Sequence, residues 1–267
     1  MNLTPELDLE QLDIALLALM MAEDIQAEQS LLQGLQRLRQ LRTEVLPRVP
    51  GGPETWQVAQ LTAAVYGELG FAANLARFHA PENCLLGTVM ATRRGVPVSL
   101  GILLMHLAQA LGIPAAGVCF PGHFLVQLGE ESPVIIDPLT GQPQSAHDLD
   151  VRLRACEGNL ARLTSAHLRP ASHKAILQRL LQVAKGAFLQ AGDAATALRC
   201  SETLLVLSPD NPYERRDRGL VLQQLACPQL AAADLDYFIE QCPADPMAGL
   251  LKQQVRQLSQ QAPVTLH

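Results

Sequence analysis

The sequence predicts an α+β domain followed by an all-α module of helical repeats. The 267 residues are 48% hydrophobic and 17% charged, which is apolar enough to build a sizeable core. Helical periodicity fills the first 70 residues, short β-type runs follow in the middle, and a 34-residue period marks the C-terminal part. We therefore expect the α+β domain over residues 1–165 and the helical repeats over residues 172–258.

Three amphipathic helices are expected at the N-terminus. The first begins at Thr4-Pro5-Glu6, because a capping hydroxyl followed by Pro at the first turn is a start signal. Its apolar face carries Leu9, Leu12, Leu16 and Leu19. The second carries apolar positions from Leu31 to Val45 and stops at Pro47. The third runs from about Glu54 to Leu69, and Gly70 ends it as a C-cap would.

The middle of the chain changes from helix to strand. Asn83 can cap a short helix that ends near Thr92, and a strongly apolar helix follows over residues 100–111. Three short β-type runs come next, separated by turns that contain Gly. They are Ala116–Cys119, His123–Leu128 and Val134–Asp137. We expect this segment to form a helix packed beside a small antiparallel sheet.

The C-terminal part repeats itself. Ser208-Pro209-Asp210-Asn211-Pro212 returns as Cys242-Pro243-Ala244-Asp245-Pro246, so that equivalent prolines lie 34 residues apart. A helix-turn-helix period of this length with Pro between the units is typical of tetratricopeptide repeats. We expect two repeats and a closing helix, and stacked helix pairs of this kind form a concave surface that suits an extended peptide or a partner helix.

Three polar residues in the middle could carry chemistry together. Ser99 lies at the start of the apolar helix, where backbone N–H groups favour an oxyanion, while His123 and Asp137 lie on neighbouring β-type runs. Nucleophile, general base and orienting carboxylate are the roles that this order suggests. Each residue also has a structural interpretation: Ser99 as a helix N-cap, His123 as a partly buried strand-end residue, and Asp137-Pro138 as the end of a strand.

The motifs around these residues resemble the core of the transglutaminase-like superfamily. They are Gly95-Val96-Pro97, Leu111-Gly112-Ile113-Pro114, Gly122-His123-Phe124 and Ile136-Asp137-Pro138. Four further stretches resemble one bacterial family that joins a transglutaminase-like domain to C-terminal tetratricopeptide repeats and is named after an invasion-gene regulator. They are Gly70-Phe71-x-x-Asn74, Pro81-Glu82-Asn83, Arg93–Leu100 and Phe120–Val126. The resemblance implies a papain-like fold with a helical layer and a small antiparallel sheet.

The sequence departs from the superfamily at the nucleophile. Pro97 stands where the superfamily has its Cys, and the nearest nucleophile is Ser99, whereas His123 and Asp137 match directly. Two interpretations follow from the resemblance. One is a degenerate site in a regulator or adaptor that binds a peptide or protein through its cleft and its repeats. The other is an active amide or ester hydrolase or acyltransferase that uses Ser99, His123 and Asp137.

Other residues with reactive or binding chemistry are more simply explained by structure. Cys119 precedes His123 by four positions but suits a small buried strand residue, and Cys84 follows the capping Asn83, where a helix start would lower the pKa of a thiol. Three arginines of the second repeat could bind a carboxylate terminus, or could form a solvated face. They are Arg215, Arg216 and Arg218.

Composition and missing motifs exclude several function classes. Twenty Lys and Arg residues against 26 Asp and Glu residues give a net charge of -6, which disfavours binding to nucleic acid or to an anionic membrane. The apolar run from Ile14 to Ala22 is far shorter than the roughly 20 residues of a membrane span, and it follows no basic leader. No HExxH, Walker, EF-hand or GxGxxG motif predicts a metal or cofactor. We expect a cytoplasmic protein with scattered, reduced cysteines.

Overall fold

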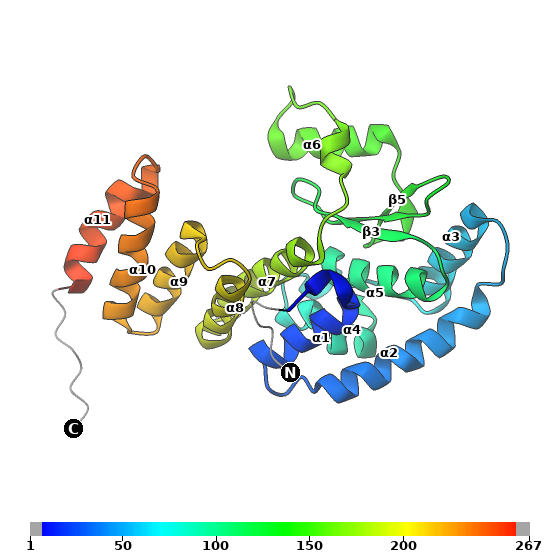
Figure 1. Ribbon diagram of the computed structural model, residues 1–267, viewed down its shortest axis with the longest axis horizontal. Helices are drawn as coiled ribbons and strands as arrows, with labels where there is room; N and C mark the ends of the chain where they lie inside the picture. The colour runs from blue at the N-terminus through cyan, green and yellow to red at the C-terminus, as the bar shows by residue number, and fades with distance from the viewer. Residues whose placement is uncertain (1–6, 260–267) are drawn as a thin grey trace. The chain divides into compact units, whose positions relative to one another are not determined.

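A computed structural model describes residues 7–259 and divides them into two compact units, residues 7–180 and 181–259 (Figure 1). The predicted fold class is confirmed, because the first unit joins helices to a small antiparallel sheet and the second is helical. The boundary falls inside helix α7 (His173–Gln190). The limits predicted for the two modules, residues 165 and 172, stay a prediction.

The N-terminal helices form where periodicity predicts them, with one shifted start. The helices are α1 (Ile14–Ile25), α2 (Leu31–Val45) and α3 (Glu54–Thr62). Asp13 caps α1, so Leu9 and Leu12 precede that helix instead of lying on its face. The start signal predicted at Thr4-Pro5-Glu6 lies outside the described residues. Beyond α3 the chain continues as a π-helix over Ala63–Glu68, and Gly70 ends it at a φ of 70°, as predicted.

Two helices and a pair of two-residue strands precede the main sheet of the first unit. The helices are α4 (Leu86–Thr92) and α5 (Pro97–Ala110), and β1 (Ala72–Ala73) pairs in parallel with β2 (Arg94–Gly95). Helix α5 starts earlier than predicted, with Pro97 in its first turn, and from Val98 to Ala108 every residue is buried. Apolar as it is, α5 is too short to cross a bilayer, and no helix within residues 7–259 is both long and apolar enough to do so.

Four antiparallel strands form the sheet in the order β3-β4-β5-β6. They are β3 (Ala115–Val118), β4 (Leu125–Leu128), β5 (Val134–Asp137) and β6 (Gln142–Pro143). Asp137 ends β5 as predicted. Strand β4 begins two residues later than predicted, so His123 lies in the turn between β3 and β4, where its N–H donates to the carbonyl of Phe120. The turn closes because Gly122 takes a φ of 67°.

Helices cover both faces of the sheet (Figure 1). Helix α5 packs closely on one face, since a Cβ at Gly101 would lie 2.5 Å from the ring of Phe124. Helix α6 (Ala146–Glu157) covers the other face through Leu149 and Leu153. Their apolar partners on the sheet are Val118, Phe120 and Leu125. Helix α6 has no counterpart among the predicted elements, and it brings Arg152 to the β3–β4 turn.

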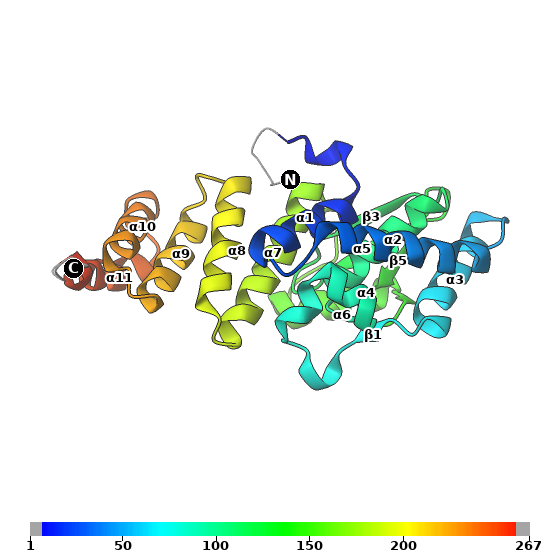
Figure 2. The same cartoon turned by 90° about the horizontal axis from the view of Figure 1, so that it is seen from below.

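The second unit confirms the predicted repeats. Its helices α8 (Ala194–Leu207), α9 (Pro212–Gln224), α10 (Pro228–Gln241) and α11 (Pro246–Ser259) follow one another as antiparallel neighbours (Figure 2). Helices α8 and α10 start 34 residues apart, and so do α9 and α11. Phe238 and Leu235 of α10 are fully buried in a core shared with α11. Each helix thus buries the apolar stripe that the repeat places at equivalent positions.

Candidate functional site

Ser99 is 0% exposed and ties the start of α5 to a preceding loop. Its Oγ accepts a hydrogen bond from the N–H of Val96 at 3.1 Å and donates to the carbonyl of Asn83 at 2.7 Å. Val96 is the N-cap residue, so Ser99 occupies the third helical position rather than the predicted cap. A Cβ at Gly95 would lie only 2.7 Å from this hydroxyl. The hydroxyl is therefore enclosed and engaged in structural hydrogen bonds.

Asn83 is buried and organises the loop that receives Ser99. Its side-chain amide donates to the carbonyls of Arg77 and Phe78 at 2.6 and 3.1 Å, and its Oδ1 accepts from Asn74 at 3.2 Å. The predicted role of Asn83 as a helix cap is wrong, because the N-cap of α4 is the backbone of Leu85. The polar residues of the sequence motifs around positions 74, 83 and 99 thus form one internal network.

Arg152 of α6 lies between His123 and Asp137. Asp137 is 4% exposed, and its carboxylate accepts hydrogen bonds from Arg152 at 2.6 Å and from the N–H of Leu139 at 2.9 Å. The Nδ1 of His123 lies 3.4 Å from the Nη1 of Arg152. Over residues 7–259 no hydrogen bond joins His123 directly to Asp137, and none joins His123 to Ser99. A guanidinium therefore separates the two side chains that the resemblance pairs.

Arg152 also sets the protonation of His123. A guanidinium only donates hydrogen bonds, so Nδ1 must accept and the ring proton resides on Nε2. Partial burial lowers the pKa of His123 below its usual range, the charges of Arg152 and Arg179 lower it further, and Asp137 offsets part of this effect. The imidazole is consequently neutral at pH 7.

Tyr66 adds a neutral polar group near Asp137. Its hydroxyl is buried and has no hydrogen-bond partner within residues 7–259. Burial, and to a smaller extent the negative charge of Asp137, raise the pKa of Tyr66 well above its usual range. The phenol therefore stays protonated and adds no charge to the site.

The cysteines near the site do not replace the missing nucleophile of the superfamily. Cys119 lies just after β3 and is exposed, which corrects the expectation of a buried strand residue. Partial burial of its thiol nevertheless raises its pKa, against an opposing effect of Arg179, so the thiolate is disfavoured. Cys84 is fully buried. Within residues 7–259, no cluster of three His, Cys, Asp or Glu side chains could hold a metal ion.

The three arginines of the second repeat are engaged within their own unit. Arg218 makes a two-point ion pair with Asp234 at 2.6 and 2.8 Å, and Arg215 lies over the ring of Tyr237 at 4.5 Å. Arg216 is paired with Asp217 at 2.7 Å. The pairs of Arg215 and Arg218 with Asp234 join α9 to α10, whereas the Arg216–Asp217 pair lies within α9. All three arginines are half-buried, and their binding to a carboxylate terminus stays a prediction.

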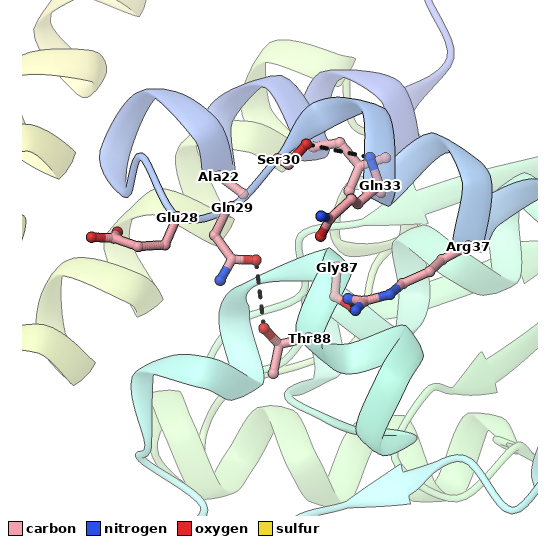
Figure 3. A pocket seen from close by; sticks show the side chains of 10 residues that line it. Ala22, Glu28, Gln29, Ser30, Gln33, Arg37, Gly87 and Thr88 are labelled. Atoms are coloured by element: carbon pink, nitrogen blue, oxygen red, sulfur yellow. Dashed lines mark hydrogen bonds between the residues drawn. The ribbon is translucent and has the colours of Figure 1, made fainter.

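A polar cavity of about 210 Å³ lies apart from these residues, among α1, α2 and α4 (Figure 3). Gln29, Gln33 and Arg37 point toward it, and Arg37 donates to the carbonyl of Gly87 at 2.8 Å. Gln29 meets Thr88 across it. None of the predicted site residues lines this cavity, so the pocket and the motif-bearing site are separate features of the first unit.

Comparison with known proteins identifies the fold that holds this site. The sequence profile of the transglutaminase-like superfamily matches residues 32–182. The chain belongs to the transglutaminase-like superfamily. A tetratricopeptide repeat profile matches residues 184–256, in the order that the motifs predict. No solved structure matches the chain.

Bacterial relatives extend this assignment over most of the chain. A UPF0162 protein of Vibrio cholerae is 42% identical over 76% of each chain. Protein SirB1 of Salmonella typhimurium is 33% identical over 87% of this chain and 86% of its own. The UPF0162 protein YchA of Escherichia coli is 34% identical over 84% of each chain. The transglutaminase-like protein thus shares its two-part organisation with a bacterial group.

Arg152 and Tyr66 are the site residues that sequence reasoning missed. A signal for Arg152 exists, since Ser145 and Asp148 form a capping box that predicts a helix over the next turns. Leu149 and Leu153 then supply the apolar face of that helix. No local pattern shows that this helix returns to the β3–β4 turn. For Tyr66 the sequence carries no signal that we can identify.

Proposed function

We propose that this chain is a regulator or adaptor that binds a peptide or protein, and that its transglutaminase-like site is degenerate. The observation that carries the proposal is the position of Arg152 between His123 and Asp137. A general base must accept a proton and become an imidazolium during acyl transfer. Beside Arg152 and Arg179 that cation is destabilised, because like charges repel.

The surroundings of Ser99 support the same proposal. A nucleophile must reach the substrate and pass its proton to the base. The Ser99 hydroxyl is buried and its proton is directed to backbone carbonyls of Asn83 and Val96. The alternative, a hydrolase or acyltransferase built on Ser99, His123 and Asp137, would require this network to open.

The repeats supply the second support. Stacked helix pairs of the tetratricopeptide type commonly serve as protein-interaction surfaces. In this chain Arg215 and Arg218 of α9 form ion pairs with Asp234 of α10. These pairs hold the two helices together before any partner binds. A rigid scaffold lowers the entropic cost of binding an extended segment.

Binding and catalysis can be tested separately on the purified full-length chain. We expect no fluorophosphonate labelling, and no turnover of p-nitrophenyl acetate or of glutamine amides above that of a Ser99→Ala/His123→Ala variant. Turnover that His123→Ala abolishes would establish the enzyme instead.

For the binding arm, peptides are selected from a displayed random library against the full-length chain. Selected peptides should bind His123→Ala about tenfold more weakly, the loss expected for one well-placed polar contact. His79→Ala, at an exposed histidine, is the matched control and should bind as the original chain does. Failure to select any peptide would overturn the proposal, and equal binding by His123→Ala would remove the His123 region from it.

A further inference from the structure

We propose that the polar cavity among α1, α2 and α4 is a binding site for a small carboxylic acid, in which Arg37 binds the carboxylate group. The guanidinium of Arg37 and the side-chain amides of Gln29 and Gln33 point toward the same space of about 210 Å³ (Figure 3). The inference goes beyond the proposed function, because the residues that line this cavity include neither His123 nor Asp137.

Arg37 brings an available positive charge to the cavity. Within residues 7–259 its guanidinium donates to the carbonyl of Gly87 at 2.8 Å and forms no ion pair. Glu28 also lines the cavity, but its carboxylate points away from Arg37 (Figure 3). The contact with Gly87 uses one N–H and holds the guanidinium in place. Its other N–H groups are left to bind the two oxygens of a carboxylate.

The two amides add neutral hydrogen-bond donors. The hydroxyl of Thr88 donates to the Oε1 of Gln29 at 3.5 Å, so the Nε2 of Gln29 is the end left to donate. In the described part of the chain neither this nitrogen nor the side-chain nitrogen of Gln33 has a hydrogen-bond partner. A carboxylate only accepts hydrogen bonds and therefore complements a cavity with an excess of donors.

Gly87 keeps the space between these donors open. A Cβ at this buried position of α4 would lie 3.3 Å from the Oε1 of Gln29 and 3.8 Å from the Nη1 of Arg37. It would therefore occupy part of the cavity between the amide and the guanidinium. The φ of Gly87 is not positive, so its backbone does not require glycine, and alanine would be the better helix former. A glycine here costs helix stability and leaves the cavity accessible.

Arg37 also lines a second cavity, of about 180 Å³, beside α2 and α4. Glu44 and Arg93 line it as well and pair with each other at 3.7 Å, so they add little net charge. Its apolar lining residues are Leu41, Phe71 and Met90. Each cavity is smaller than the roughly 300–1,000 Å³ of small-molecule sites, whereas the two together reach that range. An acid bound to Arg37 can place a polar group in the first cavity and an apolar group in the second.

The charge of the site favours a carboxylate over a phosphate group. Arg37 supplies one positive charge, and the pair of Glu44 and Arg93 supplies no net charge. A carboxylate carries one negative charge, whereas a phosphate group carries roughly one and a half to two at pH 7. The ligand class is thus a monocarboxylic acid with an amide and an apolar substituent.

The test follows the backbone N–H signals of Gly34 and Thr88, which line the first cavity, by NMR of the full-length chain. Four probes are added: N-acetylleucine, N-acetylglycine, neutral N-acetylleucine amide, and inorganic phosphate. N-acetylleucine should shift these signals saturably, N-acetylglycine should bind more weakly because it lacks the apolar group, and the neutral amide should not saturate.

Substitution of Arg37 shows whether its guanidinium binds the probe. Arg37→Gln should weaken N-acetylleucine binding about tenfold or more, and Arg37→Lys should retain part of it because the charge remains. Arg39→Gln is the matched control, since it removes one charge from an exposed position of the same helix.

Substitution of Gly87 tests the cavity without removing any polar group. Gly87→Ala should weaken binding about tenfold because the added methyl group occupies the cavity. Its melting temperature should be equal to or above that of the original chain, so unfolding would not account for the loss. Gly186→Ala is the control, since a Cβ at this position of α7 meets no atom within 4 Å.

Four outcomes would overturn the carboxylate site: no saturable shift with either acid, equal shifts with the neutral amide, tighter binding of phosphate than of both acids, or unchanged binding by Arg37→Gln or Gly87→Ala. Equal binding of the two acids would overturn the assignment of the second cavity. The peptide selection that tests the proposed function does not enter these titrations, so the two can fail separately.

Discussion

At the scale of single residues, Arg152 decides what His123 can do. In a catalytic pair the carboxylate would accept a hydrogen bond from the imidazole N–H and stabilise the imidazolium. Here Arg152 forms an ion pair with the carboxylate of Asp137, and its positive charge lies beside the imidazole of His123. The two residues that suggest an enzyme in the sequence are therefore each in contact with Arg152 rather than with each other.

Replacement of Arg152 should raise the pKa of His123. Arg152→Met removes a charge that lowers this pKa and leaves Asp137, which raises it, without its guanidinium partner. The direction is upward, so a larger fraction of His123 is protonated at pH 6 than in the original chain. An NMR titration of the histidine signals measures the change. Arg39→Met should leave the His123 titration unaltered, and a pKa that stays or falls in Arg152→Met would contradict the assigned geometry.

Ser99 should matter for stability rather than for turnover. Ser99→Ala removes the buried hydroxyl that bonds both the carbonyl of Asn83 and the N–H of Val96, and leaves these two groups only their 3.3 Å hydrogen bond to each other. The loss of such hydrogen bonds costs about 1–3 kcal/mol of the free energy of unfolding. Urea denaturation measures it, with Ser132→Ala at an exposed loop position as the control. A Ser99→Ala chain as stable as the control would show that the network contributes nothing.

At the scale of elements, Asp13 joins α1 to α5. Its Oδ1 caps α1 through the N–H groups of Ala15 and Leu16, and its Oδ2 lies 2.7 Å from the Nδ1 of His106 in α5. Burial alone would raise the pKa of Asp13, but the hydrogen bond and charge of His106, with the two backbone N–H groups, lower it overall. The ionised form is thus favoured by folding.

The Asp13 pair should give a pH-dependent contribution to stability. Asp13→Asn keeps a capping oxygen and loses the charge, and should cost about 1 kcal/mol at pH 7 because the pair is only partly buried. A folded-state pKa below 3.8 means that this contribution is present above pH 3.8 and is lost as the pH falls through the folded-state value. Urea denaturation from pH 7 to pH 3 should show the difference shrinking. Asp8→Asn, at an exposed cap, is the control, and a difference independent of pH would exclude the charge as its source.

Most elements are predictable from the sequence, whereas their contacts are not. The face of α2, the Gly70 cap, the end of β5 at Asp137 and the repeat period follow from periodicity and turn chemistry, which act over a few residues. The position of Arg152 between His123 and Asp137 depends on how α6 packs on the sheet. That packing is set by contacts between apolar side chains far apart in the sequence, which no local pattern predicts. Helix α1 starts after Asp13, whose carboxylate caps it, whereas Asp8 caps only the short 3-10 helix Leu9–Gln11 before it.

At the scale of the whole molecule, two units with different cores share one chain. The first encloses α5 and the sheet, and the second is a set of stacked helices with its own buried cluster. Units of this kind can lose stability separately when the interactions that hold them are local. The second unit contains one interaction whose removal tests this directly.

Lys185 is the buried cation of the second unit. Its Nζ lies 2.8 Å from both carboxylate oxygens of Glu214, which is 4% exposed, and 3.0 Å from Asp217. The surroundings are dry enough that burial raises the pKa of the neighbouring Cys200 to about 12 despite the opposing charge of Lys185. Removal of one partner leaves a charge buried and uncompensated, which costs about 3–5 kcal/mol.

Lys185→Ala should therefore open the second unit without opening the first. Hydrogen exchange should show protection in α9 falling by about two to three orders of magnitude, while protection in α5 stays the same. The double variant Lys185→Met/Glu214→Leu should recover most of the loss, because apolar residues of similar volume can replace a buried pair. Equal losses of protection in α5 and α9 would show that the chain opens as a single cooperative unit. Unchanged protection in α9 would show that the buried pair is dispensable.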